Sequence, residues 1–157
     1  MKIPFMRFLQ LEECPAEWTE MDLYLVRDGD TVFYVGRSYR AFDRVWNHVR
    51  NGYKARSDVG RFLLVNWPRS LHFEIELLSS RSPEFDRVGH DAAAAEELLI
   101  RCHRPCFNDS LNDDPISLPA GYRPPSSPIR CPRSPRGLRS QAARAVREEE
   151  KPRWIAE

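Results

Sequence analysis

The sequence has little of what disulfide-rich, membrane-spanning or repetitive proteins require. Its four cysteines are too few and too scattered for a disulfide framework. No apolar run approaches the roughly 20 residues that cross a bilayer, and Pro4 and Arg7 break the short apolar start that a signal peptide would need. The chain contains no internal repeat. These absences favour an intracellular, thiol-reduced protein that does not bind a membrane.

Charge and proline are concentrated at the C-terminal end of the chain. From Gly121 onward, eight arginines and one lysine stand against four glutamates, a net charge of +5, so that residues 1–120 carry −4. Eight of the thirteen prolines lie from Pro115 onward. This composition cannot bury a core, and it predicts a disordered tail over residues 112–157. A basic tail on a mildly acidic body is also a candidate arm for contacting a polyanion.

Two short runs of β-forming residues, Leu23–Val26 and Thr31–Val35, predict a hairpin. The pair Asp28-Gly29 between them supplies the positive φ that a tight turn needs. Gly36 ends the second strand, and Ser38 is expected to cap the helix that follows.

That first helix carries an apolar stripe at i, i+3, i+4 and i+7, formed by Phe42, Val45, Trp46 and Val49. Arg44 and His48 are four residues apart and share a different face. Tyr24 and Tyr34 lie one on each strand of the hairpin. The hairpin and helix therefore bring two tyrosines, an arginine and a histidine to one side of the unit.

The remaining pattern predicts two further helices and one further strand. A second helix begins at Ser57 or Asp58 and stops before Pro68, residues 71–78 alternate as a half-buried strand, and a long helix covers residues 84–104. The order β-β-α-α-β-α predicts an α+β fold, with a small three-stranded antiparallel sheet flanked by helices. This domain is expected over residues 21–111, after a lead-in over residues 1–20 that packs against it.

The spacing of these residues resembles the GIY-YIG nuclease superfamily. Its first motif falls on Asp22-Leu23-Tyr24 and its second on Tyr34-Val35-Gly36. Its arginine, eight residues after the motif glycine, falls on Arg44, and its helical histidine falls on His48. Its metal-binding glutamate falls on Glu96, within AEELLIRCHRPCFN, whose end also matches the superfamily. The sequence departs from the pattern at position 22, where the superfamily has glycine.

The resemblance implies a metal-dependent endonuclease that hydrolyses DNA phosphodiester bonds. Glu96 would hold one Mg²⁺ (or Mn²⁺) that keeps most of its waters, and Arg44 would donate to phosphate oxygens. Tyr24 is the preferred residue for activating water, with Tyr34 as the alternative. A tyrosine has an ordinary pKa near 10, so it needs a nearby metal or cation for this role. His48 would hydrogen-bond the tyrosine or shuttle a proton.

Four residues at the hairpin–helix junction are candidate substrate contacts: Gly36, which lets backbone and substrate approach closely, and Arg37, Ser38 and Arg40. Nuclease modules of this superfamily serve in homing endonucleases, restriction enzymes and excision repair, and often gain specificity from a second DNA-binding domain. Here the tail or a separate targeting protein would supply it.

Two other functions stay open. One is a nucleic-acid-binding module without turnover, which the added acid Asp22 favours. The other is an adaptor whose Pro- and Arg-rich tail recruits another protein. Cys102, His103 and Cys106 form a cluster in the sequence, but a zinc site would need a second close pair of ligands.

Overall fold

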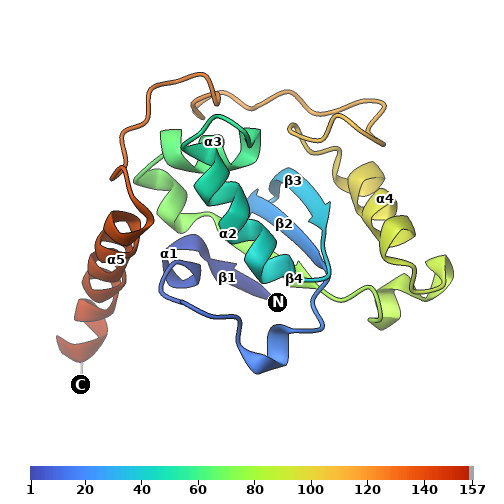
Figure 1. The fold of residues 1–157 in the computed structure, drawn as a ribbon, viewed down its shortest axis with the longest axis horizontal. Coiled ribbons are helices and arrows are strands. Elements are labelled where there is room, and N and C mark those ends of the chain that lie inside the picture. The colour runs from blue at the N-terminus through green and yellow to red at the C-terminus, as the bar shows by residue number, and fades with distance from the viewer. Residues whose placement is uncertain (156–157) are drawn as a thin grey trace.

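A computed structural model describes residues 1–155 as an antiparallel sheet with helices on both faces (Figure 1). The strand order is β1-β4-β2-β3, with strands β1 (Lys2–Pro4), β2 (Leu23–Asp28), β3 (Thr31–Arg37) and β4 (Glu74–Leu78). The α-helices are α1 (Phe5–Phe8), α2 (Ala41–Gly52), α3 (Asp58–Val65), α4 (Ala92–His103) and α5 (Pro135–Ile155). Short 3₁₀ helices are η1 (Ala16–Trp18), η2 (Arg69–His72) and η3 (Pro83–Val88). None of the helices in this described range is long and apolar enough to span a membrane.

The predicted α+β class is confirmed, but the sheet has four strands rather than three. The extra strand is β1, within the expected lead-in, where Ile3 pairs with Ile75 of β4. The amino group of Met1 also donates to the carbonyl of Leu77 at 3.0 Å. A three-residue strand is too short to show an alternating pattern, and Pro4 suits an edge strand because it has no N–H to donate. The sequence pattern therefore missed it.

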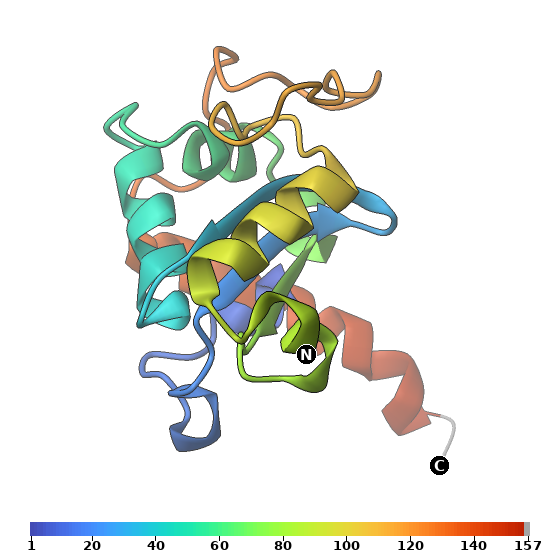
Figure 2. The same cartoon turned by 90° about the vertical axis from the view of Figure 1, so that its right-hand side faces the viewer.

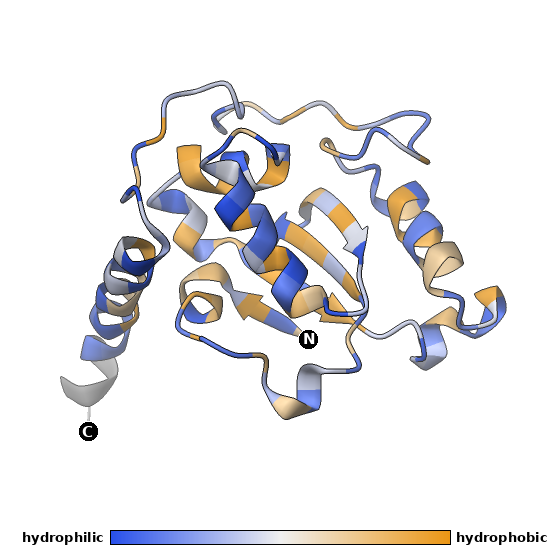
Figure 3. Ribbon diagram, in the orientation of Figure 1, coloured by the Kyte–Doolittle hydropathy of each residue, from blue (hydrophilic) through white to orange (hydrophobic). Residues whose placement is uncertain are grey.

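Helices cover the two faces of the sheet through separate apolar clusters. Tyr24 and Val26 of β2 belong to the cluster beneath α2 and α3, whereas Leu23 and Leu25 belong to the cluster beneath α4. This is the alternation expected of a strand buried on both sides. Figure 2 shows α4 lying across the face of β2 and β3, and Figure 3 shows hydrophobic residues along both strands.

Several predicted boundaries were wrong. The strand expected over residues 71–78 begins at Glu74, because η2 occupies the residues before it. The helix expected over residues 84–104 is divided, since Gly89 and His90 adopt left-handed φ angles of 66° and 56°. Helix α4 then starts after Asp91, whose carboxylate accepts a hydrogen bond from the amide of Ala94 at 3.0 Å.

Of the two predicted helix caps, one is confirmed and one is wrong. Ser57 caps α3 as predicted, since its hydroxyl oxygen accepts from the amide of Gly60 at 3.0 Å. Ser38 does not cap α2, because the helix begins two residues later than that role requires. Its hydroxyl oxygen accepts from the amide of Arg40 at 3.2 Å instead.

The segment after α4 lies against the domain, in contrast to the predicted disorder. Tyr122 packs beside Phe33 and Phe62, with ring centroids 5.0 and 6.1 Å away, and its hydroxyl donates to Asp28 at 2.6 Å. The side-chain amide of Asn66 pairs with both the N–H and the carbonyl of Arg123, each at 2.9 Å. Residues 112–134 thus form a strap across the body of the protein (Figure 1).

Helix α5 continues this packing. Leu138 and Ala142 are fully buried in the main core, and Trp67 donates from its indole N–H to Gln141 at 2.8 Å. The residues that anchor the strap and α5 are spaced singly among prolines and arginines, so composition alone does not reveal them. The division of the chain at residues 20 and 111 stays a prediction, although both flanking segments contact the central part.

The burial of Leu138 predicts a measurable contribution of α5 to stability. We expect Leu138→Ala to lower the free energy of unfolding by about 2–5 kcal/mol, the usual cost of truncating a buried leucine. Ile116→Ala, at a position 46% exposed, is the matched control and should change stability by less than ~0.5 kcal/mol. Urea denaturation followed by tryptophan fluorescence measures both. Equal stability of the two variants would show that α5 is not docked.

Candidate active site

Tyr24 and Gly36 face each other directly across strands β2 and β3. A methyl group placed on Gly36 would overlap the ring and hydroxyl of Tyr24. Only glycine leaves room for the tyrosine here. The close approach that Gly36 permits in the structure is therefore that of Tyr24, and its contact with substrate stays a prediction.

Tyr24 begins a chain of hydrogen bonds that runs from the core to the start of α3. Its hydroxyl lies 2.8 Å from Nε2 of His48, and Nδ1 of His48 lies 2.8 Å from the hydroxyl of Ser57. The amide of Gly60 donates to the same Ser57 oxygen. Helices α2 and α3 come this close because Gly60 has no side chain, as a methyl group there would overlap the carbonyl of His48.

Burial sets the protonation of these groups. The pKa of His48 is lowered to about 4 by burial and by the nearby Arg44, so the ring is neutral at neutral pH. Burial and the neighbouring Tyr34 raise the pKa of Tyr24 well above its ordinary value, and Arg44 only partly offsets this. Burial also raises the pKa of Tyr34, with Glu96 adding to the effect while Tyr24 and Arg44 oppose it. Both tyrosines therefore carry their protons unless more positive charge approaches.

Tyr34 lies between two surface hollows that together are lined by three other predicted catalytic residues, whereas the buried Tyr24 lines neither. Arg44 and His48 line a hollow of about 200 Å³, and Glu96 and Asn108 line one of about 350 Å³. Tyr34 lines both. The edge strand β3 thus brings the tyrosine, arginine, histidine and glutamate of the predicted site together, although Glu96 comes from the helix that covers the opposite face of the sheet.

Glu96 is held at this edge by Arg37. The arginine Nε donates to a Glu96 carboxylate oxygen at 2.8 Å, and the Glu96 side chain is 19% exposed. Glu97, one position along α4, turns away and pairs with Arg101 at 2.5 Å. Arg37, predicted as a substrate contact, is thus in an ion pair with the predicted metal ligand.

The residues present fit a metal ion held by one carboxylate rather than by a cage of protein ligands. Within the described part of the chain, no group of three or more His, Cys, Asp or Glu side chains converges as a metal site, and Cys102, His103 and Cys106 form none. Glu96 is partly exposed at a polar hollow. A hard divalent cation can bind one such carboxylate and complete its coordination with water.

Asn108 fixes the far wall of the site. Its side-chain amide bonds both backbone groups of Val35, accepting from the N–H at 2.9 Å and donating to the carbonyl at 2.8 Å. The amide of Phe107 donates to Phe33 at 3.0 Å. These bonds cover the free edge of β3 beside Tyr34, and the prediction that Asn108 ties down the chain after the last helix is confirmed.

Asp22, where the sequence departs from the superfamily pattern, has a structural role. Its carboxylate accepts hydrogen bonds from the amide and the hydroxyl of Ser80, at 2.7 and 2.6 Å. Burial, Tyr34 and Arg44 are what shift the pKa of Tyr24. The acid at position 22 therefore joins two loops instead of disturbing the tyrosine.

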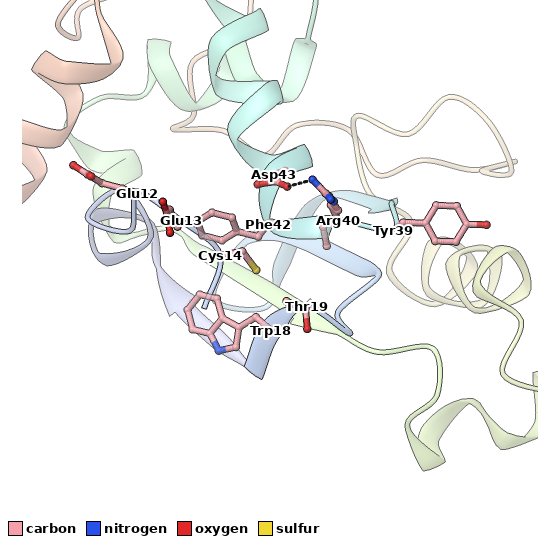
Figure 4. A pocket seen from close by; sticks show the side chains of 10 residues that line it. Glu12, Glu13, Cys14, Trp18, Thr19, Tyr39, Arg40, Phe42 and Asp43 are labelled. Carbon is pink, nitrogen blue, oxygen red and sulfur yellow. Dashed lines mark ion pairs between the residues drawn. The ribbon is translucent and has the colours of Figure 1, made fainter. Parts of the chain in front are cut away.

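Ser38 and Arg40 lie just before α2, where they share a hollow of about 490 Å³ with Arg44 and Asn47 of the helix. Arg40 is highly exposed, and its nearest carboxylate is that of Asp43 at 3.8 Å. Figure 4 shows Arg40 at the edge of another hollow, of about 430 Å³, which is lined by the acidic residues Glu12, Glu13 and Asp43 and by Trp18. That acidic lining does not suit phosphate, so Arg40 is better placed toward Arg44.

Ser57 is the functional candidate that sequence reasoning missed. The sequence identifies it as a helix cap, and that signal is correct. Its second contact, with His48, depends on the close crossing of α2 and α3, which Gly60 permits. A glycine three residues after a capping serine was the only local sign of that crossing.

The lowered pKa of His48 predicts a loss of stability in mild acid. An unfolded histidine titrates near 6.5, whereas folded His48 does so at about 4. Below pH 6.5 the unfolded chain binds the additional proton first, so the contribution of neutral His48 is full above this value and is lost as the pH falls toward 4. We expect a loss of about 3 kcal/mol in unfolding free energy, at ~1.4 kcal/mol per pKa unit.

Urea denaturation at pH 7 and at pH 4 measures this loss, with His48→Gln as the control that should lack this part of it. NMR titration of the ring protons gives the pKa directly. A His48 pKa near 6.5 would contradict the prediction.

The sequence is 31% identical over 106 residues to the UvrABC system protein C of Trichormus variabilis, and to the same extent to that of a Nostoc species. The matched region makes up 67% of this chain, but the chain spans only 14% of the length of these curated relatives. No protein-family model matches the sequence, and no solved structure matches it. The similarity thus concerns one part of much longer proteins.

Proposed function

We propose that this chain is a GIY-YIG-type endonuclease module that hydrolyses DNA phosphodiester bonds with the help of a divalent metal ion. The observation that carries the proposal is the hydrogen bond between Tyr24 and neutral His48, beside hollows that hold Tyr34, Arg44 and Glu96. The motif resemblance and the similarity to UvrABC system protein C support it. A role in DNA repair is proposed with it.

In this proposal Tyr24 activates the attacking water. Because Tyr24 is almost fully buried and Tyr34 lines the hollows, the water proton would reach the Tyr24 oxygen by way of the neighbouring Tyr34 hydroxyl, while the proton of Tyr24 passes to the lone pair on Nε2 of the neutral His48 ring. This requires the tautomer in which Nδ1–H donates to Ser57. A serine oxygen has two acceptor positions, and the amide of Gly60 fills the other. The water oxygen then forms a bond to phosphorus as the bond from phosphorus to the leaving oxygen breaks. The leaving oxygen takes a proton from solvent at the open hollow, and His48 returns its proton to solvent through the tyrosines.

Arg44 and Glu96 stabilise the charge of this reaction. Arg44 is exposed at the hollow beside His48 and would donate to non-bridging phosphate oxygens. Glu96 would hold Mg²⁺ or Mn²⁺, which when bound supplies positive charge to phosphate oxygens and favours the phenolate of a nearby tyrosine. Arg37, which neutralises Glu96 in the structure, is half exposed and would then be available for a phosphate.

Tyr34 has a supporting role in this proposal. Tyr24 is 1% exposed, whereas Tyr34 is half-buried and lines both hollows. Tyr34 would therefore orient water or phosphate at the surface, while Tyr24 moves the proton through His48. The alternative of a binding module without catalysis depended mainly on Asp22 disturbing the site. That argument is weakened, because the Asp22 carboxylate is hydrogen-bonded to Ser80.

Nicking of supercoiled plasmid tests the assignment. We expect nicking in Mg²⁺ or Mn²⁺ but not in EDTA, with Tyr24→Phe slower by about 10²–10⁴-fold, the usual contribution of a general base. Arg44→Gln should cost about 10²–10³-fold, as for the loss of a donor that stabilises developing charge. Glu96→Gln should remove the response to metal.

Glu97→Gln is the matched control, since that side chain pairs with Arg101 away from the site, and it should cut at the wild-type rate. If Tyr34→Phe lost activity while Tyr24→Phe kept it, the roles of the two tyrosines would be exchanged. Nicking that survives in all the variants, or in EDTA, would refute the proposed site.

A further inference from the structure

Most of the strap and the first part of α5 carry a large positive charge with no acidic residue among them. Between Pro115 and Arg147 the sequence contains no aspartate or glutamate, yet it contains seven arginines: Arg123, Arg130, Arg133, Arg136, Arg139, Arg144 and Arg147. This charge is held on the body of the protein, because Tyr122, Cys131 and Leu138 anchor the segment in the core. It is therefore a fixed surface and not a loose tail.

Arg130, Arg133 and Arg136 differ from the arginines on the opposite side of the protein. All three are exposed, and none has a carboxylate of the described residues within 4 Å. Around η3 and α4, by contrast, Arg81 pairs with Glu20 and Arg101 pairs with Glu97. Exposed arginines without acidic partners stay hydrated, so they pay little desolvation free energy. They are available to bind an external anion.

These arginines adjoin the basic end of the candidate active site. The hydroxyl of Tyr53 donates to the carbonyl of Pro132 at 2.7 Å. Pro132 lies between Arg130 and Arg133, and Tyr53 directly precedes Lys54, so this hydrogen bond brings the two basic segments together. Arg56, two residues later, lines the hollow that also holds Arg44 and His48. Figure 1 shows the strap passing over the ends of α2 and α3 in this region.

We propose that Arg130, Arg133 and Arg136 bind the phosphate backbone of duplex DNA beside the cleaved bond, in one track with Lys54, Arg56 and Arg44. The place of the cut rests on the proposed function, whereas the binding itself does not. Separate exposed guanidinium groups suit phosphates along a strand and do not read bases. The strap would thus add affinity without sequence preference, in place of a second DNA-binding domain.

Because the segment is already ordered, binding need not pay for folding it. Gly137 packs closely against Pro132, and its amide donates to Ser134 at 3.1 Å. Arg133 and Arg136 both lie within this turn, between Pro132 and Gly137, so their backbone positions are fixed. Preorganised cations lose less conformational entropy on binding than cations on a disordered arm.

The salt dependence of DNA binding by the full chain tests the track. We compare wild type with the triple variant R130Q/R133Q/R136Q, using fluorescence anisotropy on a labelled duplex of about 30 base pairs, in EDTA so that no cleavage occurs. Each lost phosphate contact lowers the slope of log K against log[salt] by about 0.9, so the triple variant should lose about 2.7. Its affinity at 50 mM salt should fall at least about tenfold.

The matched control is R81Q/R87Q/R101Q, which removes the same charge from the η3 and α4 side and should leave the slope nearly unchanged. The variant R130K/R133K/R136K keeps the charge and should keep the slope. Equal losses in the two glutamine variants would show that net charge alone acts, and would overturn the track. An unchanged slope in R130Q/R133Q/R136Q, or no binding by wild type at 50 mM salt, would overturn it as well.

The result separates the two proposals. Reduced binding by R130Q/R133Q/R136Q in a protein that never nicks plasmid would support the track and refute the nuclease. Metal-dependent nicking with an unchanged salt slope would do the reverse. Equal thermal unfolding midpoints of the variants would exclude misfolding as the cause.

Discussion

The ring of Tyr24 fills the space above Gly36 on the neighbouring strand, and the candidate site depends on this contact. It fixes where the hydroxyl of Tyr24 lies, and so where a histidine must come from to meet it. The helix after β3 supplies that histidine two turns along its length. Gly60 then lets the next helix approach until Ser57 reaches the other ring nitrogen. Gly36 and Gly60 thus determine the geometry of the Tyr24–His48–Ser57 hydrogen bonds by leaving space for them, although neither glycine contributes a side chain.

Tyr24 and His48 of this chain are buried, and their burial explains both its stability and its chemistry. A buried phenol and a buried imidazole are each costly unless hydrogen-bonded, and here both have partners, with the part-buried hydroxyl of Ser57 at the end of the chain. The same burial keeps His48 neutral and Tyr24 protonated. A site that holds its protons so firmly needs positive charge from outside before it can act. Arg44 and Glu96 lie at the surface, where a phosphate and a metal ion would arrive.

Short-range pattern was enough to predict the hairpin, the order of the central elements and the spacing of Tyr24, Arg44 and His48. Those features depend on turn chemistry and on helical periodicity, which a few neighbouring residues specify. The contacts of Ser57 and Asp22 could not be predicted, because each joins segments whose separation only the packed structure fixes. Strand β1 was missed for a related reason, since its three residues gain their order from β4.

The C-terminal segment shows where composition misleads. Many prolines and arginines usually indicate a chain that cannot bury enough apolar surface to fold by itself. This segment does not fold by itself, because its few apolar residues enter a core built by the rest of the chain. Tyr122 completes a group of aromatic rings and Leu138 fills a space beside α1. The prolines limit the conformations open to the linking residues, which lowers the entropy cost of fixing them. With Tyr122, Cys131 and Leu138 inside, the arginines between them stay at the surface, so the packing that orders the strap also creates its basic surface.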